Sequence, residues 1–247
     1  MLGGLITRDG KVRDEAEKPF WISYADLMTA LMVLFLVVMT VALVSVTEEI
    51  DEVKEREKKQ QAAISELLDE LQQEIKPFEA DGVVLDRDRR TIEFGSRATF
   101  EHNQAVLPLD KQEALRQFIP SVLKVAATEK GRRWIRRIVV EGYTSQSGDY
   151  LYNLNLSLKR SQSFLCALFA PAESEESTLS SDELRQIRSL FIVGGYSANL
   201  AKRTDEESRR VELRVEFYGS RPEEFENSRE QQWSSDNFGR CYPGWLQ

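Results

Sequence analysis

The chain has 247 residues, with 33 Lys and Arg against 41 Asp and Glu, so the formal net charge is −8. An acidic chain of this kind lacks the basic surface that phosphate backbones require, which argues against a nucleic-acid partner. A single histidine, His102, and two cysteines, Cys166 and Cys241, rule out a histidine-cluster metal site and a zinc site of four thiolates, and we expect no metal or other cofactor.

An uncharged apolar stretch of 20 residues, Leu27–Val46, lies near the N-terminus. As a helix it is about 30 Å long, the thickness of a hydrocarbon core. Its twelve Leu, Val and Phe residues contribute on the order of −5 kcal/mol to insertion, against at most about +3 for the nearest charge, Asp26. The stretch is too long for a signal peptide and lacks a good cleavage site. We therefore expect an uncleaved transmembrane helix over residues 19–46.

The flanking charges predict the orientation of this helix. Arg8, Lys11, Arg13 and Lys18 precede it, whereas the first basic residue after it is Lys54. Because Lys and Arg favour the cytoplasmic side, residues 1–18 are expected in the cytoplasm and everything after Val46 outside it.

Asp26 is a carboxylate at the edge of the membrane segment. Such a group is costly in a bilayer and is a functional candidate, since it could take up an ion on one side and release it on the other. The alternative is that Asp26 caps the helix N-terminus. Pro19 could begin the helix, which would put Asp26 two turns inside it and favour the functional reading. One span cannot enclose an ion path, so conduction would need a multi-span partner.

The segment PFWISYADLMTALMVLFLVVM resembles the membrane helix of MotB-type stator subunits, through Ala25, Asp26, Met28, Thr29, Ala30, Met32, Phe35 and Leu36. The resemblance implies that Asp26 carries the ion (a proton), and that the chain is a homodimer inside a ring of a multi-span MotA-like subunit in a bacterial inner membrane. The sequence FWISYADLMTA resembles the ZorB branch of Zorya anti-phage defence systems. That branch implies a ZorA-like ring, sensing of envelope damage and indirect signalling to cytoplasmic effectors. A flagellar stator and a passive membrane-to-wall tether are the alternatives.

Residues 47–77 form a linker that is almost free of helix breakers and rich in Glu, Lys, Gln and Ala. Its apolar residues follow a heptad-like spacing at Ile64, Leu68, Leu71 and Ile75. Two interpretations stay open: a two-chain coiled coil, or a helix that packs on its own domain. Pro77 is expected to end the helix.

Residues 78–217 have the length of one ordinary domain. The pattern predicts a hairpin (82–85 and 91–94), a helix (109–128), a strand (134–141), a long helix (150–169), a short helix (181–188), a strand (190–193), a short helix and a last strand (211–217). Alternating strands and helices favour an α+β sandwich with one mixed sheet. The acidic Ser-rich stretch 171–182 reads as a solvated loop.

On the helix expected at 150–169, five leucines share one face: Leu151, Leu154, Leu158, Leu165 and Leu168. Asn153, Ser157 and Arg160 share a different, polar face. An amide beside a guanidinium suits a carboxylate or amide ligand, although an ordinary solvated face explains the same pattern.

The segment GYTSQSGDYLYNLNLSLKRS resembles the OmpA-like peptidoglycan-binding signature, and SRRVELRVEF resembles a later strand of that family. The resemblance implies a βαβαβ fold and a wall-binding groove in which Asn153 and Arg160 face the cell-wall peptide. Tyr143 and Ser145 replace the His and Asp of the signature, and Ser145 carries no charge for a ligand ammonium group. The peptidoglycan-binding residues that we expect are Thr144, Ser145, Tyr152, Asn153, Leu156 and Arg160.

Residues 218–247 form a tail that is rich in aromatic residues, among them Trp233, Phe238, Tyr242 and Trp245, and we expect it to fold back on the domain. In the oxidising periplasm, the even cysteine count makes a Cys166–Cys241 disulfide plausible, and two unrelated thiols are the alternative. We do not expect an enzyme, because His102 has no recognisable nucleophile motif beside it.

Overall fold

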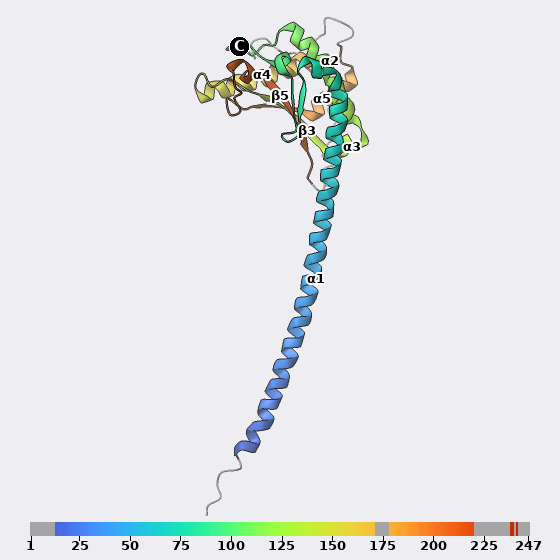
Figure 1. The fold of residues 1–247 in the computed structure, drawn as a ribbon, viewed down its shortest axis with the longest axis vertical. Helices are drawn as coiled ribbons and strands as arrows, with labels where there is room; N and C mark the ends of the chain where they lie inside the picture. Colours follow the sequence, from blue (N-terminus) through green and yellow to red (C-terminus); the bar gives the residue numbers. More distant parts are fainter. Residues whose placement is uncertain (1–12, 171–177, 220–237, 240, 242–247) are drawn as a thin grey trace, which may run out of the picture. The chain divides into compact units, whose positions relative to one another are not determined.

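The computed structural model describes residues 13–170, 178–219, 238–239 and 241, with side chains from residue 21 onward (Figure 1). The chain divides into two compact units, one that ends at Glu55 and one that begins at Arg56. The elements, in chain order, are α1 (Arg13–Ile75), η1 (Lys76–Asp81), β1 (Val84–Asp86), β2 (Thr91–Glu93), η2 (Gly95–Ala98), α2 (Leu109–Ala127), α3 (Glu129–Trp134), β3 (Ile135–Gly142), α4 (Tyr150–Phe169), α5 (Ser181–Leu190), β4 (Phe191–Gly195), α6 (Asp205–Ser208) and β5 (Val211–Phe217).

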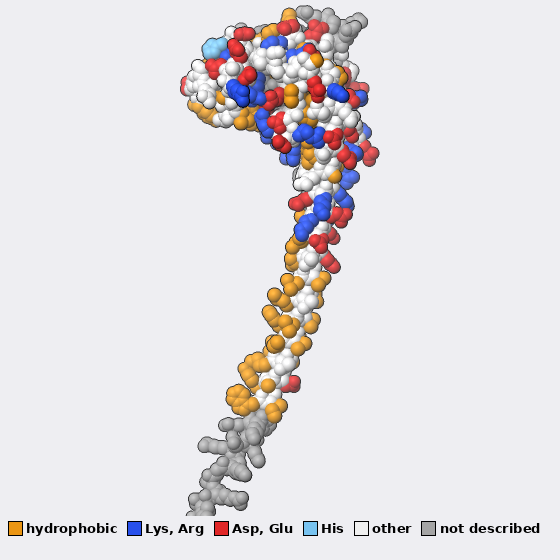
Figure 2. Space-filling view, viewed as in Figure 1, with side chains coloured by type: hydrophobic (Ala, Val, Ile, Leu, Met, Phe, Trp, Pro, Cys, Tyr) orange, Lys and Arg blue, Asp and Glu red, His pale blue; other side chains and the backbone are white. Residues whose placement is uncertain are grey.

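Helix α1 is long because no Gly or Pro interrupts the sequence between Phe20 and Lys76. It begins at Arg13, before Pro19, and ends where Pro77 opens η1. From Trp21 it is long and apolar enough to cross a membrane. Every side chain from residue 21 to 55 is exposed, and Figure 2 shows hydrophobic side chains around this stretch. This apolar surface is left for lipid or for other chains.

The second unit contains a mixed five-stranded sheet in the order β1-β2-β5-β3-β4. Only β3 and β4 are parallel, and α4 and α5 make the crossover between them that a parallel pair requires. The central strands are antiparallel, with Leu213 of β5 opposite both Ile92 and Val140. A single long apolar helix followed by a mixed-sheet α+β domain confirms the fold class expected from the sequence.

The C-terminal part of α1 belongs to this domain. Its stripe of Ile64, Leu68, Leu71 and Ile75 is buried, and it forms one core with residues of α2, α4 and the sheet. Ion pairs flank the stripe: Glu74 lies 2.7 Å from Lys124 of α2 and Asp69 lies 2.7 Å from Arg87. The structure therefore agrees with the second interpretation of the linker, in which the helix packs on its own domain. These residues are not available to a coiled coil.

Charged side chains at alternate positions along β5, together with Glu141 of β3, form a layer on the sheet. Glu212 is buried between Arg210 (2.6 Å) and Arg89 (2.9 Å). Glu141 is buried with Arg214 at 2.6 Å, and it accepts a hydrogen bond of 2.6 Å from the hydroxyl of Tyr143. Burial and the hydrogen bond to Glu141 raise the pKa of Tyr143, which keeps this phenol protonated. Buried carboxylates at these positions are tolerated because each has a cationic partner.

Candidate functional site

Asp26 is the only charged residue between Trp21 and Thr47. It lies 13 residues after Arg13, the first residue of α1, so it is not at the helix end and does not serve as its cap. Its side chain is exposed in the described part of the first unit. Thr29 follows three residues later on a neighbouring part of the helix face and donates its hydroxyl to the carbonyl of Ala25 at 2.7 Å.

The loop between β3 and α4 carries the second set of candidates. Asp149 caps α4, since its Oδ1 accepts the backbone N–H of Tyr152 at 2.8 Å. Gly148 has φ +95°, a conformation that suits glycine. Asn153 donates its Nδ2 to the carbonyl of Ser147 at 2.9 Å, which ties the loop to the first turn of α4. These contacts fix the loop in one position.

The polar face of α4 is buried, so it is not the ordinary solvated face that was one of its two interpretations. Ser157 accepts the N–H of Ser197 at 3.0 Å, and Ser161 donates to the carbonyl of Gly194 at 3.1 Å. Of the leucine face, Leu168 is buried but Leu151 and Leu158 are exposed. Small residues allow this burial, because α4 approaches β3 so closely that a Cβ on Gly142 would lie 1.9 Å from the carbonyl oxygen of Ser157.

Arg160 is fully buried, with 0% of its surface exposed. Its guanidinium donates to three backbone carbonyls: Tyr143 at 2.8 Å, Gln104 at 2.9 Å and Glu101 at 3.3 Å. It also lies 5.1 Å from the ring of Phe100. Burial, and then the charge of Arg209, lower the pKa of Arg160 to about 10. Residues 101–104 cover Arg160, and the carbonyls of Glu101 and Gln104 accept two of its hydrogen bonds, so contact between Arg160 and a wall ligand stays a prediction.

The other expected wall-binding residues divide by exposure. Thr144, Ser145 and Asn153 are buried, Leu156 is partly buried, and only Tyr152 is exposed. The hydroxyl of Tyr152 donates to the side-chain oxygen of Asn103, so the first turn of α4 and the loop 101–104 meet at this edge. The hydroxyl of Thr144 has no hydrogen-bond partner within the described part of the chain. Sequence reasoning missed the loop 101–104, which carries no motif of its own.

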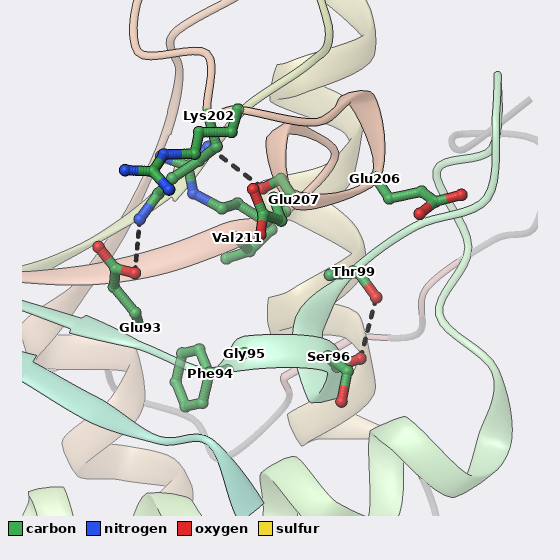
Figure 3. A pocket seen from close by; sticks show the side chains of 11 residues that line it. Glu93, Phe94, Gly95, Ser96, Thr99, Lys202, Glu206, Glu207 and Val211 are labelled. Carbon is green, nitrogen blue, oxygen red and sulfur yellow. Dashed lines mark hydrogen bonds and ion pairs between the residues drawn. The ribbon is translucent and has the colours of Figure 1, made fainter.

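A cavity of about 740 Å³ lies elsewhere, between β2, η2 and α6. Figure 3 shows Lys202 facing Glu93 on one side of it and Thr99 near Ser96 on the other. Lys202 lies 2.6 Å from Glu93, and Arg210 is paired with Glu212. The cavity therefore presents mixed, largely paired charges. Throughout the described ranges, no group of three or more His, Cys, Asp and Glu residues is placed to hold a metal ion.

Cys166 of α4 and Cys241 form a disulfide in the structure. Near it, the ring of Phe238 lies 5.4 Å from that of Phe169, and the guanidinium of Arg188 lies 5.1 Å from the Phe238 ring. These described tail residues therefore lie against α4 and α5. Most of the tail expected to fold back lies outside the described residues.

Comparison with known proteins gives a close relative. The family model for membrane MotB of the proton-channel complex MotA/MotB matches residues 7–65. Zorya protein ZorB of Escherichia coli O139:H28 is 47% identical over 219 residues, 89% of this chain and 89% of that protein. Among solved structures, a putative MotB-like protein from Desulfovibrio vulgaris is 17% identical, with 66% of this chain and 99% of that chain covered and a TM-score of 0.41. The periplasmic domain of Helicobacter pylori MotB is 12% identical, with coverage of 57% and 85% and a TM-score of 0.38.

Proposed function

Because the chain belongs to the ZorB family of Zorya proteins, we propose that it is a peptidoglycan-anchored stator subunit of an ion-driven motor in the inner membrane, acting in anti-phage defence. The observation that carries this proposal is Asp26, a lone carboxylate in the interior of an apolar helix that nothing else in its unit covers. The chain acts by transport and anchoring, with no covalent chemistry of its own.

Asp26 is the ion carrier in this proposal. A carboxylate costs about 2.5–3.5 kcal/mol at the centre of a membrane helix and less toward the edge where Asp26 lies, a cost that a tether without transport has no reason to bear. Protonation from one side and release to the other would move one proton for each cycle of the carboxyl group. A single helix leaves Asp26 open to its surroundings, so the path needs a second copy of the chain and a multi-span, MotA-like (ZorA-like) ring subunit.

The mixed-sheet domain is the wall anchor, on the periplasmic side. Four basic residues precede the apolar segment and none follows it before Lys54, which favours a cytoplasmic N-terminus. The disulfide between Cys166 and Cys241 suits an oxidising compartment. With the domain held by peptidoglycan, a ring that moves around the fixed dimer would do work. In the defence version, envelope damage caused by a phage starts this motion and cytoplasmic effectors receive the signal.

Plating of phage on a non-motile host tests this function. The host expresses the chain with its neighbouring genes, as wild type, Asp26→Asn or Asp51→Asn. Asn keeps the size and hydrogen bonding of Asp but does not cycle a proton, and Asp51, an exposed carboxylate just beyond the apolar segment, is the matched control.

We expect protection by the wild type and by Asp51→Asn, and none by Asp26→Asn at an equal membrane level. Equal protection by all three forms would refute ion carriage by Asp26. A lack of protection by any form would remove the support for a defence role under those conditions, and motility complementation with the same variants would then test the flagellar alternative.

A further inference from the structure

The cavity between β2, η2 and α6 has the size and the lining of a site for a small ligand. Its volume of about 740 Å³ lies within the usual range for ligand pockets, about 300–1,000 Å³. Phe94 and Val211, which are buried in the domain, give it an apolar base. Its other lining side chains are mostly polar or charged, so a ligand would meet both kinds of surface.

Most charges of this cavity are neutralised within the chain. Lys202 lies 2.6 Å from Glu93, and Arg210 lies 2.6 Å from Glu212. The guanidinium of Arg210 also donates to the carbonyl of Leu200 at 3.2 Å. These groups already have partners of opposite charge, so the specificity of the cavity depends on the lining groups that remain.

Three lining side chains have no hydrogen-bond or ion-pair partner within the described ranges. They are the guanidinium of Arg203, the carboxylate of Glu206 and the hydroxyl of Ser96, and all three residues are exposed. Figure 3 shows Glu206 on the same side of the cavity as Ser96, away from Lys202. The cavity therefore offers one cation and one anion that its own domain does not neutralise, together with a hydroxyl that can donate or accept.

A second cavity, of about 540 Å³, adjoins the first, because Ser96 and Thr99 line both. Its two cations are held within the chain, since Lys111 donates to the carbonyl of Thr99 at 2.8 Å and Arg97 is in an ion pair. The exposed carboxylate of Asp110 also lines it. A ligand that extends past Ser96 would therefore meet further negative charge on this side, which favours the placement of an ammonium group there.

We propose that the two cavities bind a short zwitterionic peptide. Arg203 donates two parallel hydrogen bonds to the carboxylate of the peptide. Glu206 accepts from its ammonium group, with the hydroxyl of Ser96 as a further acceptor. The side chains of the peptide pack on Phe94 and Val211. The inference goes beyond the proposed function, because the expected wall-binding residues lie at the junction of β3 and α4, outside the lining of these cavities.

The test is thermal unfolding of the full chain in detergent, with the dipeptide alanylalanine as the probe at about 10 mM. Acetylation of its amino group or amidation of its carboxyl group removes one of its two charges. The variants are Arg203→Gln and Glu206→Gln, each of which removes one charge from the cavity. The matched control is Asp205→Asn, because Asp205 is exposed and adjoins Glu206 in the chain but does not line the cavity.

Co-sedimentation with sacculi distinguishes two sources of such a peptide, the cell wall and the free peptides of the periplasm. If the ligand belongs to the wall, Arg203→Gln with Glu206→Gln should bind sacculi about tenfold more weakly than the wild type. If the ligand is a free peptide, sacculus binding should stay unchanged while the response to the dipeptide is lost. Either result supports the cavity as the site.

We expect the dipeptide to raise the melting temperature of the wild type and of Asp205→Asn by about 3 °C, the shift that a dissociation constant of about 1 mM gives. The shift should fall to about 1 °C or less for either blocked dipeptide, and for the zwitterion with either variant. The inference is overturned if the zwitterion does not shift the wild type, if the blocked forms shift it equally, or if both variants respond as the wild type does. Failure of the wild type to bind sacculi would instead refute the wall-anchoring function and leave the dipeptide result unaffected.

Discussion

Replacement of Arg160 by alanine should destabilise the domain before it affects any ligand. The guanidinium donates at 2.8 Å to the carbonyl of Tyr143 and at 2.9 Å to that of Gln104, and both acceptors would lose their partner. A buried unsatisfied acceptor costs about 1–3 kcal/mol, so the two together cost about 2–6 kcal/mol. The alanine variant no longer bears the cost of burying a charged guanidinium, which offsets part of this loss and leaves a net destabilisation of about 3 kcal/mol. For a unit of this size, that lowers the melting temperature by about 6–12 °C.

The assay is thermal unfolding of the full chain in detergent, followed by tryptophan fluorescence, with the exposed Arg203→Ala as matched control. The control should melt within about 2 °C of the wild type, since surface changes cost less than about 0.5 kcal/mol. The pKa of Arg160 is lowered in the folded chain to about 10, below its value in the unfolded chain. The penalty of the buried charge is therefore fully present at neutral pH and is relieved only as the pH rises through 10. Between about pH 5 and 9, the difference between wild type and Arg160→Ala should not change.

The reasoning about Arg160 would be refuted if Arg160→Ala melted with the wild type but no longer bound sacculi. That result would mean that residues 101–104 open in solution and that the guanidinium contacts the wall. A melting difference that grew or shrank steadily between about pH 5 and 9 would contradict the linkage argument in the same way.

Three further changes probe the domain. Leu71→Ala should lower the free energy of unfolding by about 2–5 kcal/mol, since Leu71 is buried in the core of its own domain. The melting temperature should not depend on protein concentration, as it would if these residues formed a coiled coil with a second chain. Reduction of the Cys166–Cys241 disulfide, with a sequence separation of 75, should cost about 2–4 kcal/mol, which melting with and without reductant measures; two free thiols in non-reducing mass spectrometry would contradict the bond. Arg214→Met should leave Glu141 buried without a cation and cost about 2 kcal/mol at neutral pH, which thermal unfolding measures; an unchanged melting temperature would contradict the pairing.

The membrane segment and the order of strands and helices could be predicted because local pattern decides them. The run from Leu27 to Val46 has no charge, and the periodicity around β3, α4 and β5 places these elements within a residue or two of their observed bounds. The close packing of α4 could not be predicted in this way. Its polar face reads as solvated by residue type, but serines opposite glycines such as Gly142 let the helix approach the sheet, and hydrogen bonds satisfy the buried groups.

The candidate wall site shows the same limit. The motif placed Arg160 on the correct helix but did not reveal that the loop 101–104 covers it, where the carbonyl of Gln104, 56 residues earlier, accepts a hydrogen bond from its guanidinium. Contacts between segments so far apart leave no local periodicity in the sequence. The spacing of Ile64, Leu68, Leu71 and Ile75 had two interpretations for the same reason, since an apolar stripe does not reveal whether another chain or its own domain will cover it.

Decay of an imposed pH gradient tests the central claim most directly. Liposomes would contain the chain together with its multi-span partner, with a pH-sensitive dye inside, as wild type, Asp26→Asn, Asp26→Glu and Asp51→Asn. We predict that the wild type and Asp51→Asn dissipate the gradient faster than empty liposomes, that Asp26→Glu retains part of this rate, and that Asp26→Asn decays no faster than empty liposomes. Equal decay in the wild type and Asp26→Asn would contradict the account, because the carboxyl group of Asp26 would then carry no protons.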